Sequence, residues 1–363
     1  MMLETHGDIC RLGYLRIIPC LLEDEAPKTF DFLASLFFEI VRNVQDGNFL
    51  IGRPIGLITR PVNARNYVTL AAELALIDRR SQKLGGFGKL YLCMRSASRF
   101  RRLVDGDRSL KLIDLLMLND AEKLFFLWAL FTRDYPFIQL ITSWAIKKGR
   151  FRRQEAMIYA MEEAYPQSLK KVLPRSRIKE VEVAQRFRER RLAIKDKVEW
   201  IKSSQYAKYR HIAPPRFEWL VDCGILKRSG RGKYEVNSQM LYDPQAILKL
   251  ASLSPEKIDH YFFNDFLKPL FRVYKPAERY DVFKTMLEVY DKMRSYFGER
   301  VDLVKLECMT ALTLMEKGLI ADLSSIHDAF NSLAIQFPDK IYVMPGARGK
   351  SPLAYIDTKD LEV

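Results

Sequence analysis

The chain has 363 residues, of which 48% are hydrophobic and 12% aromatic, and its formal net charge is +14 at pH 7. This length suits two to four folded modules, and this apolar content argues against disorder over most of the chain. The basic excess favours a polyanionic partner, because Lys and Arg side chains that neutralise phosphates release condensed counterions.

The sequence carries no pattern for export or for a membrane span. The first ten residues include Glu4 and Asp8 and lack a basic start followed by a long apolar run, so no signal peptide is expected. The most apolar region, residues 115–146, is interrupted by five charged side chains and predicts a pair of buried helices. Five scattered cysteines without a Cys-x-x-Cys pair are typical of reduced, buried thiols. We expect a cytoplasmic protein, nucleoid-associated if its source is prokaryotic.

Residues 1–103 are predicted to form an N-terminal module. A short apolar strand region at residues 14–22 precedes a helix that begins near Phe30, and a second helix begins at Asn63. The basic stretch at residues 78–92 contains Gly-Phe-Gly-Lys-Leu-Tyr. Because glycine allows the positive φ of a tight turn, this stretch predicts a hairpin with Lys89 at its exposed tip.

Residues 104–240 are predicted to form a central module. Its first two helices are expected to begin at residues 119–120 and at Pro136, and a third at Arg152. A long basic helix is expected over residues 177–203, with its apolar positions inward and its arginines exposed.

The end of the central module carries the clearest hairpin pattern. The prolines at residues 214–215 are predicted to open a helix that ends at Gly224, where a left-handed residue is favoured. A strand follows at residues 225–226. The sequence Lys-Arg-Ser-Gly-Arg-Gly-Lys at residues 227–233 then predicts an exposed basic turn before a returning strand at residues 234–236.

Residues 241–363 are predicted to form a third, helical module that ends in an acidic segment at residues 301–363. Helices are expected over residues 255–270, 277–296 and 303–317, and over a segment capped by Ser324. Residues 340–357 predict a strand, a turn and a second strand, with Ala347-Arg348-Gly349-Lys350 in the turn.

The order of helix, hairpin and basic tip recurs in all three modules. In the central module, Leu-x-x-x-Gly-Ile-Leu at residues 220–226 precedes the basic turn and a strand that contains Tyr234. This segment resembles the winged helix-turn-helix superfamily. The resemblance implies a tandem winged-helix protein, mainly α with small β-hairpins, in the α+β class. The alternative is that these glycine-rich turns are unrelated loops.

Charge is segregated along the chain. Residues 1–50 carry four basic and eight acidic side chains, and residues 301–363 carry six and nine. In contrast, residues 79–102 carry eight basic side chains and no acidic one, residues 147–197 carry sixteen and seven, and residues 198–233 carry eight and three. We therefore predict that a central basic surface binds double-stranded DNA and that the acidic ends contact other proteins or a second copy. A solubility feature or a membrane-surface patch is the alternative for charge alone.

The resemblance implies that the second helix of each turn motif faces the major groove and that each wing reaches phosphates or the minor groove. On the third module this helix carries Asp328, which repels phosphate, so protein contact is expected there. DNA contacts are predicted for exposed polar and basic side chains, which are Arg60, Arg65, Asn66, Thr69, Lys89, Arg99, Arg101, Arg102, Arg150, Arg152, Arg153, Arg186, Arg190, Lys208, Arg210, His211, Arg216, Arg228, Arg231 and Lys233. For any single residue, a solvated helix face is the alternative.

The sequence contains no Gly-x-x-x-x-Gly-Lys-Ser/Thr phosphate loop, no Gly-x-Ser-x-Gly elbow and no His-Glu-x-x-His. We expect a protein without catalytic residues, metal or cofactor. One alternative is a recognition or scaffolding subunit of a restriction, phage-defence or chromosome-organising complex whose enzyme is another chain. Others are a structural protein whose winged helices bind proteins, and a divergent metal-dependent nuclease that uses Asp302, Lys305 and Glu307. The residues predicted to contact nucleic acid do not indicate whether it is RNA or DNA.

Overall fold

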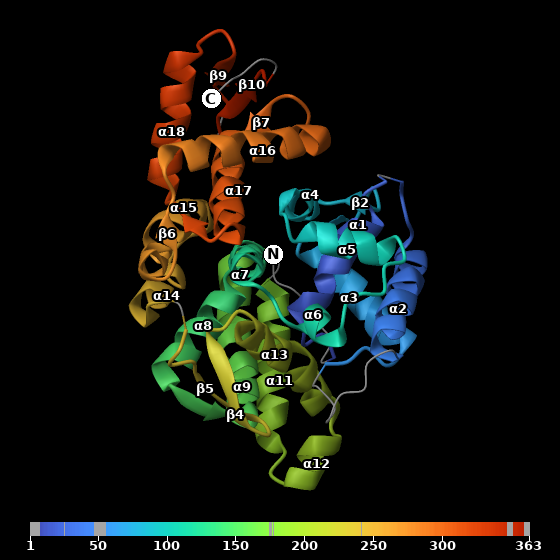
Figure 1. Ribbon diagram of the computed structural model, residues 1–363. Helices are drawn as coiled ribbons and strands as arrows, with labels where there is room; N and C mark the ends of the chain where they lie inside the picture. The colour runs from blue at the N-terminus through green and yellow to red at the C-terminus, as the bar shows by residue number, and fades with distance from the viewer. Residues whose placement is uncertain are drawn as a thin grey trace.

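The computed structural model describes residues 8–24, 26–46, 56–173, 176, 178–240, 242–346 and 351–358. Helices predominate in these residues, and the strands form small sheets, which confirms the α+β class (Figure 1). One continuous cluster of buried side chains extends from Ile9 to Ile356. Among the described residues, no helix has both the length and the apolar character needed to cross a membrane.

The N-terminal region is helical from its first turn. The expectation of a strand at residues 14–22 is wrong, because a continuous apolar run that is buried on every side fits a core helix as well as a strand. The elements of this region are η1 (Leu12–Arg16), α1 (Ile17–Leu21), α2 (Phe30–Asp46), α3 (Pro61–Glu73), β1 (Ile77–Asp78), β2 (Lys83–Leu84), α4 (Gly86–Cys93) and α5 (Ala97–Val104).

The first basic stretch forms a shorter hairpin than the sequence predicts. Strands β1 and β2 pair as an antiparallel hairpin, and the chain then enters α4 at Gly86. A Cβ atom on Gly88 would lie 2.2 Å from the backbone oxygen of Leu76, so glycine is needed there for close packing of α4. The prediction of a hairpin over residues 78–92 with Lys89 at its tip is therefore wrong from Gly86 onward, and Lys89 lies on a helix.

The central region confirms the expected helices at residues 119–120 and Pro136. The Asn119 side chain caps the first of them by accepting a hydrogen bond from the backbone N–H of Glu122 (2.8 Å). The elements are α6 (Leu112–Leu116), α7 (Asp120–Arg133), α8 (Phe137–Lys148), β3 (Arg150–Arg152), α9 (Arg153–Tyr159), η2 (Ala160–Ala164), α10 (Tyr165–Val172), α11 (Ile178–Ala193), α12 (Lys197–Lys202), α13 (Ser204–Asp222), β4 (Leu226–Gly230) and β5 (Lys233–Val236).

Two helix boundaries in this region differ from the predictions. The basic segment breaks into α11 and α12, because Asp196 caps α12 by accepting from the backbone N–H of Val198 (2.9 Å). The prolines at residues 214–215 lie inside α13 and do not open it. Each proline lacks the backbone N–H that donates a helix hydrogen bond. Residues 212–220 are buried on all sides, and this burial stabilises the helix despite the two lost hydrogen bonds.

The C-terminal region follows the predicted order of helices and strands. Asp322, and not Ser324, caps α18, since its carboxylate accepts from the backbone N–H of Ser325 (2.8 Å). The predicted turn at residues 347–350 lies outside the described residues. The elements are α14 (Pro244–Leu250), α15 (Pro255–Tyr261), η4 (Phe262–Phe266), η5 (Lys268–Arg272), β6 (Lys275–Pro276), α16 (Arg279–Phe297), β7 (Val301–Asp302), α17 (Leu303–Glu316), β8 (Leu319–Ile320), α18 (Leu323–Gln336), β9 (Ile341–Met344) and β10 (Leu353–Ile356).

Two parts of the chain share one topology. We call α8 to β5 the central unit and α16 to β10 the C-terminal unit. Apart from β8, which pairs with β6 outside the C-terminal unit, each runs helix, strand, helical segment, helix, strand, strand. The sheet orders are β3-β5-β4 and β7-β10-β9, all antiparallel. The central unit differs by the insertion of α11 and α12 before its last helix. In Figure 1 the C-terminal unit is at the upper end and the central unit at the lower end.

Helix α7 joins these two units through apolar contacts. The Trp128 ring meets Phe263 edge to face at 5.2 Å, and its Nε1 donates to Asp259 (2.7 Å). The Lys305 ammonium lies over the same indole at 4.7 Å. The core is therefore continuous between the halves of the chain.

Candidate nucleic-acid interface

The hairpin of β4 and β5 forms a wing whose tip is exposed. The strands pair from Leu226 with Val236 to Gly230 with Lys233. Gly232 has φ +65°, a backbone conformation that glycine adopts without strain. Arg231 and Lys233 are exposed, and neither forms an ion pair within the part of the chain that the structure describes.

The base of the wing is fixed to the core through Glu218. The Tyr234 hydroxyl donates to Glu218 Oε1 (2.6 Å), and burial raises the pKa of this tyrosine well above its usual value. Arg228 Nε donates to Glu218 Oε2 (2.9 Å). Glu218 is buried, so Arg228 serves as its counter-charge and anchors the wing.

The third strand, β3, places further basic side chains beside the wing. The guanidinium of Arg150 pairs with Glu235 (2.9 Å) although it is exposed. Arg152 is exposed, and the backbone N–H of Arg153 donates to the Gly232 carbonyl (2.8 Å). The start of α9 therefore lies against the wing tip.

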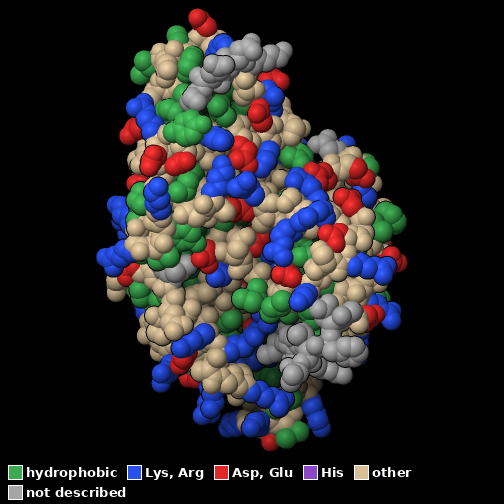
Figure 2. Space-filling model, viewed as in Figure 1, with side chains coloured by type: hydrophobic (Ala, Val, Ile, Leu, Met, Phe, Trp, Pro, Cys, Tyr) green, Lys and Arg blue, Asp and Glu red, His purple; other side chains and the backbone are tan. Residues whose placement is uncertain are grey.

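Helices α11 and α12 form a basic arm. Arg186, Arg188 and Arg190 are exposed and form no ion pair among the described residues. Only two of the 16 residues of α11 are buried, and they pack against Leu169 in a small cluster separate from the main core. Figure 2 shows Lys and Arg side chains gathered at the lower end of the molecule, around α12. We use "central basic surface" for the wing tip, the start of α9 and this arm, with Arg152, Arg153, Arg186, Arg190, Lys197, Lys202, Arg231 and Lys233.

Helix α13 does not present the predicted outer face. Arg216 is fully buried, and its guanidinium binds both carboxylate oxygens of Asp134 (2.7 and 2.9 Å) and the Ile212 carbonyl (2.7 Å). The prediction that Arg216 contacts DNA is therefore wrong. Lys208 and Arg210, one to two turns earlier on this helix, are exposed, and His211 is half-buried.

Some of the polar residues predicted to contact DNA from the N-terminal region form hydrogen bonds or ion pairs within the protein. Arg60 is exposed. Arg65 pairs with Asp31 (3.2 Å), and the Thr69 hydroxyl donates to the Arg65 carbonyl (3.0 Å). Asn66 donates to the carboxylate of Asp8 (3.2 Å). The acidic groups beside α3 weaken its attraction for phosphate.

The basic side chains of residues 79–102 connect the N-terminal region to the C-terminal unit. Lys89 donates to the Tyr296 carbonyl (2.7 Å), and Arg101 donates to the Tyr296 hydroxyl (3.2 Å) while it pairs with Glu23 (2.6 Å). Arg102 alone among the predicted residues of this stretch is exposed without an ion pair in the described chain. Four of the eight basic side chains, those of Arg79, Arg95, Arg99 and Arg101, therefore have carboxylate partners within the molecule.

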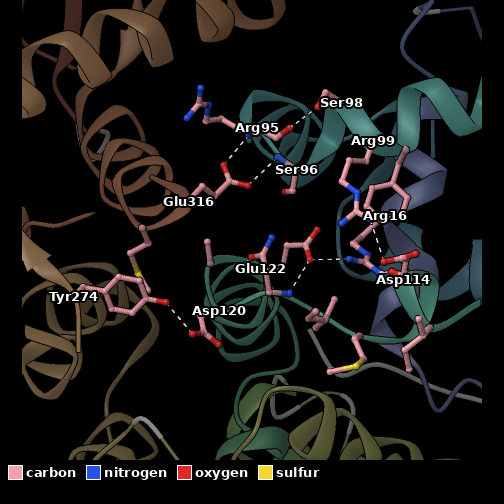
Figure 3. A pocket seen from close by; sticks show the side chains of 17 residues that line it. Arg16, Arg95, Ser96, Ser98, Arg99, Asp114, Asp120, Glu122, Tyr274 and Glu316 are labelled. Atoms are coloured by element: carbon pink, nitrogen blue, oxygen red, sulfur yellow. Dashed lines mark hydrogen bonds and ion pairs between the residues drawn. The ribbon is translucent and has the colours of Figure 1, made fainter. Parts of the chain in front are cut away.

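A pocket of about 790 Å³ opens between the start of α5, α7 and α17 (Figure 3). The carboxylate of Glu316 accepts from the backbone N–H groups of Arg95 and Ser96 (2.7 and 2.8 Å), and burial raises its pKa. Each arginine that lines the pocket has a carboxylate partner: Arg16 with Glu122 (2.7 Å), Arg99 with Asp114 (3.0 Å) and Arg95 with Glu288 (3.8 Å). The arginines of this pocket are thus already neutralised and offer a phosphate little net attraction.

The residues of the nuclease alternative do not converge. Asp302 caps α17, Lys305 pairs with Asp259, and Glu307 meets the His327 imidazole (2.6 Å). In the described part of the chain, no three His, Cys, Asp or Glu side chains lie close enough together to hold a metal ion. All five cysteines are buried thiols, as predicted, and burial raises the pKa of Cys10 and Cys20 to about 12.

Sequence reasoning missed the lysines of α12 and the role of β3 as the third strand. Lys197 and Lys202 lie on α12, the short helix that follows the break in the basic segment. The aspartate before Lys197 was the available signal, since aspartate is a favoured helix cap. Comparison with protein-family models, with curated proteins and with solved structures found no match to this chain.

Proposed function

We propose that this protein binds double-stranded DNA through its central basic surface. One observation carries the proposal: Arg186, Arg190, Arg231 and Lys233 are exposed and lack ion-pair partners among the described residues. Exposed cations without carboxylate partners attract a polyanion, and each phosphate that they neutralise releases condensed counterions.

We propose further that the central and C-terminal units are winged-helix modules. The shared order of elements and the sheet order of first, third and second strand support this assignment. Because α13 is buried over residues 212–220, the second half of this helix offers no face to a groove. The wing and the inserted α11 and α12 are the surfaces left to contact DNA.

The proposal predicts strongly salt-dependent binding. If about six phosphates are neutralised, the affinity for a duplex is expected to fall by about a thousandfold between 50 and 200 mM salt. Fluorescence anisotropy with a labelled duplex measures this slope. An affinity that does not change with salt contradicts the electrostatic mode.

Charge variants locate the surface. Replacing Arg186, Arg190, Arg231 and Lys233 together by alanine is expected to weaken binding to all sequences alike, because phosphate contacts position without specifying. The matched control replaces four exposed cations outside this surface, Lys257, Arg272, Lys284 and Arg300, and so removes the same charge. Equal losses from the two variants would show that binding follows net charge and not this surface.

A second candidate function is that of a DNA-recognition subunit in a larger complex. The C-terminal unit supports it, because Ile335 on α18 is 82% exposed and β9, an edge strand of its sheet, exposes Tyr342 and Val343. The acidic ends are proposed to contact protein in this case. Tight DNA binding by the purified chain favours the first function, whereas binding that needs a partner protein favours the second.

A further inference from the structure

A small pocket lies within the central basic surface. It has a volume of about 170 Å³ and opens between α9, α12 and α13. Met157, Trp200, Ile201 and Tyr206 form its largely apolar walls. Arg153, Gln154 and Lys197 also line it, so two cations flank an apolar cavity.

The pocket is next to the wing tip. The backbone N–H of Arg153, which lines the pocket, donates to the carbonyl of Gly232 in the wing turn (2.8 Å). A DNA backbone that contacts the exposed Arg231 and Lys233 is therefore expected to pass near the opening. Lys197, across the pocket, is placed to hold the next phosphates.

The wall of the pocket is held in place before any ligand arrives. Trp200 is buried, its ring meets Tyr209 edge to face at 5.0 Å, and the Arg191 guanidinium lies 5.1 Å from its centroid. Tyr206 in turn meets Trp200 edge to face at 5.5 Å. A preformed wall avoids the cost of ordering side chains on binding.

Helix α12 exposes apolar side chains in a charged setting. Val198 is 58% and Ile201 is 49% exposed, and both lie between Lys197 and Lys202. Only Ile201 of these two apolar residues lines the pocket. An apolar side chain that lines a pocket among phosphate-binding cations, as Ile201 does, is suited to contact with a base, whose faces are apolar.

We propose that this pocket receives a single unstacked base of the bound DNA. The inference rests on the proposed function and narrows its substrate to DNA that contains an unpaired base. The volume is below the range of about 300–1,000 Å³ typical of pockets for larger ligands, so it suits one ring system. Extrusion costs least for a base that is already unpaired, so a bulged duplex is the preferred ligand.

The experiment compares three labelled duplexes at one salt concentration: fully paired, with a one-base bulge of 2-aminopurine, and with an abasic bulge. The full-length protein is expected to bind the first bulge about tenfold more tightly than the other two, with a change in 2-aminopurine fluorescence. Abasic DNA has the same flexibility without the base, so equal affinity for both bulges overturns the proposal.

Two matched variants assign the effect to the pocket. Ile201→Ser removes an apolar wall and is expected to abolish the bulge preference, whereas Val198→Ser changes an equally exposed neighbour outside the pocket and is expected to keep it. Both are expected to bind the paired duplex as the natural protein does. If paired DNA is bound without preference for the bulge, only this inference fails. If no DNA is bound, the proposed function fails with it.

Discussion

Arg216 has a charge that is fully enclosed by the protein. Its guanidinium binds Asp134 with two hydrogen bonds and lies 4.3 Å from the centroid of the Phe137 ring, and both charged groups have no exposed surface. The partners are 82 positions apart in sequence. No local pattern on α13 therefore distinguishes this arginine from the exposed Arg210 one and a half turns earlier.

Removing one partner of this pair is expected to destabilise the protein strongly. Arg216→Ala leaves the Asp134 carboxylate buried without its counter-charge, and such a change typically costs about 3–5 kcal/mol in the free energy of unfolding. Urea denaturation followed by circular dichroism measures this loss. Arg210→Ala, on the exposed part of the same helix, is the control and is expected to change stability by less than about 0.5 kcal/mol. Similar losses from both would contradict the structural role of the pair.

At the scale of elements, the two glycine-rich basic stretches have different structures. The prediction of a hairpin at residues 227–236 is confirmed, since Gly232 there supplies a positive φ. Gly88 instead allows α4 to approach Leu76. Sequence shows where glycine occurs but not which of its two properties is used, because close approach depends on a neighbour that folding supplies.

The sequence predicted the candidate site correctly only for basic side chains that have no carboxylate partner in the described residues. The exposed Arg186, Arg190, Arg231 and Lys233 lie where the sequence placed them. Arg101 does not take part, because Glu23, 78 positions away, neutralises it. Long-range carboxylate partners of this kind decide whether a basic residue is free, and they leave no mark in the local pattern.

The three basic residues of the wing are expected to separate into two roles. Arg231→Ala with Lys233→Ala is expected to weaken DNA binding without changing the melting temperature, because both side chains are exposed. Arg228→Ala is expected to lower the free energy of unfolding by about 1–3 kcal/mol, because the buried Oε2 of Glu218 then has no hydrogen-bond donor from this side chain.

Thermal melting and anisotropy on the same samples distinguish the two roles. A double variant that unfolds would place Arg231 or Lys233 in the structural framework. If the Arg228→Ala variant has an unchanged melting temperature but a weaker affinity for DNA, Arg228 belongs to the binding surface.

At the scale of the whole molecule, the charge pattern and the core divide the chain differently. Charge separates an acidic C-terminal module from a basic centre, whereas Trp128 of α7 packs against Phe263 across that boundary. Helix α7 also packs against α15 and α17. The module boundaries at residues 103 and 240 stay a prediction, and the second of them crosses a continuous core.

Deleting residues 241–363 is therefore expected to unfold or aggregate the remainder. The deletion uncovers Trp128 and its apolar neighbours, and a newly exposed patch of this kind promotes association. Light scattering and the melting temperature of the truncated chain test this. The full-length Ile335→Ser variant, which changes an exposed residue of the same segment, is expected to melt as the natural protein does. A soluble, cooperatively melting truncation would show that the first 240 residues fold independently.

The slight anchoring of α11 has a consequence for binding thermodynamics. Only Val181 and Ala184 of this helix are buried. Phe187 adds a stacking contact with Tyr209 at 6.0 Å. We therefore expect α11 to open locally at a lower free energy than global unfolding. DNA that contacts Arg186 and Arg190 is therefore expected to order α11, whereas the pocket wall on α12 is already packed. Part of the electrostatic gain is offset by lost conformational entropy, so measured affinity understates the strength of the contacts that the ordered arm makes.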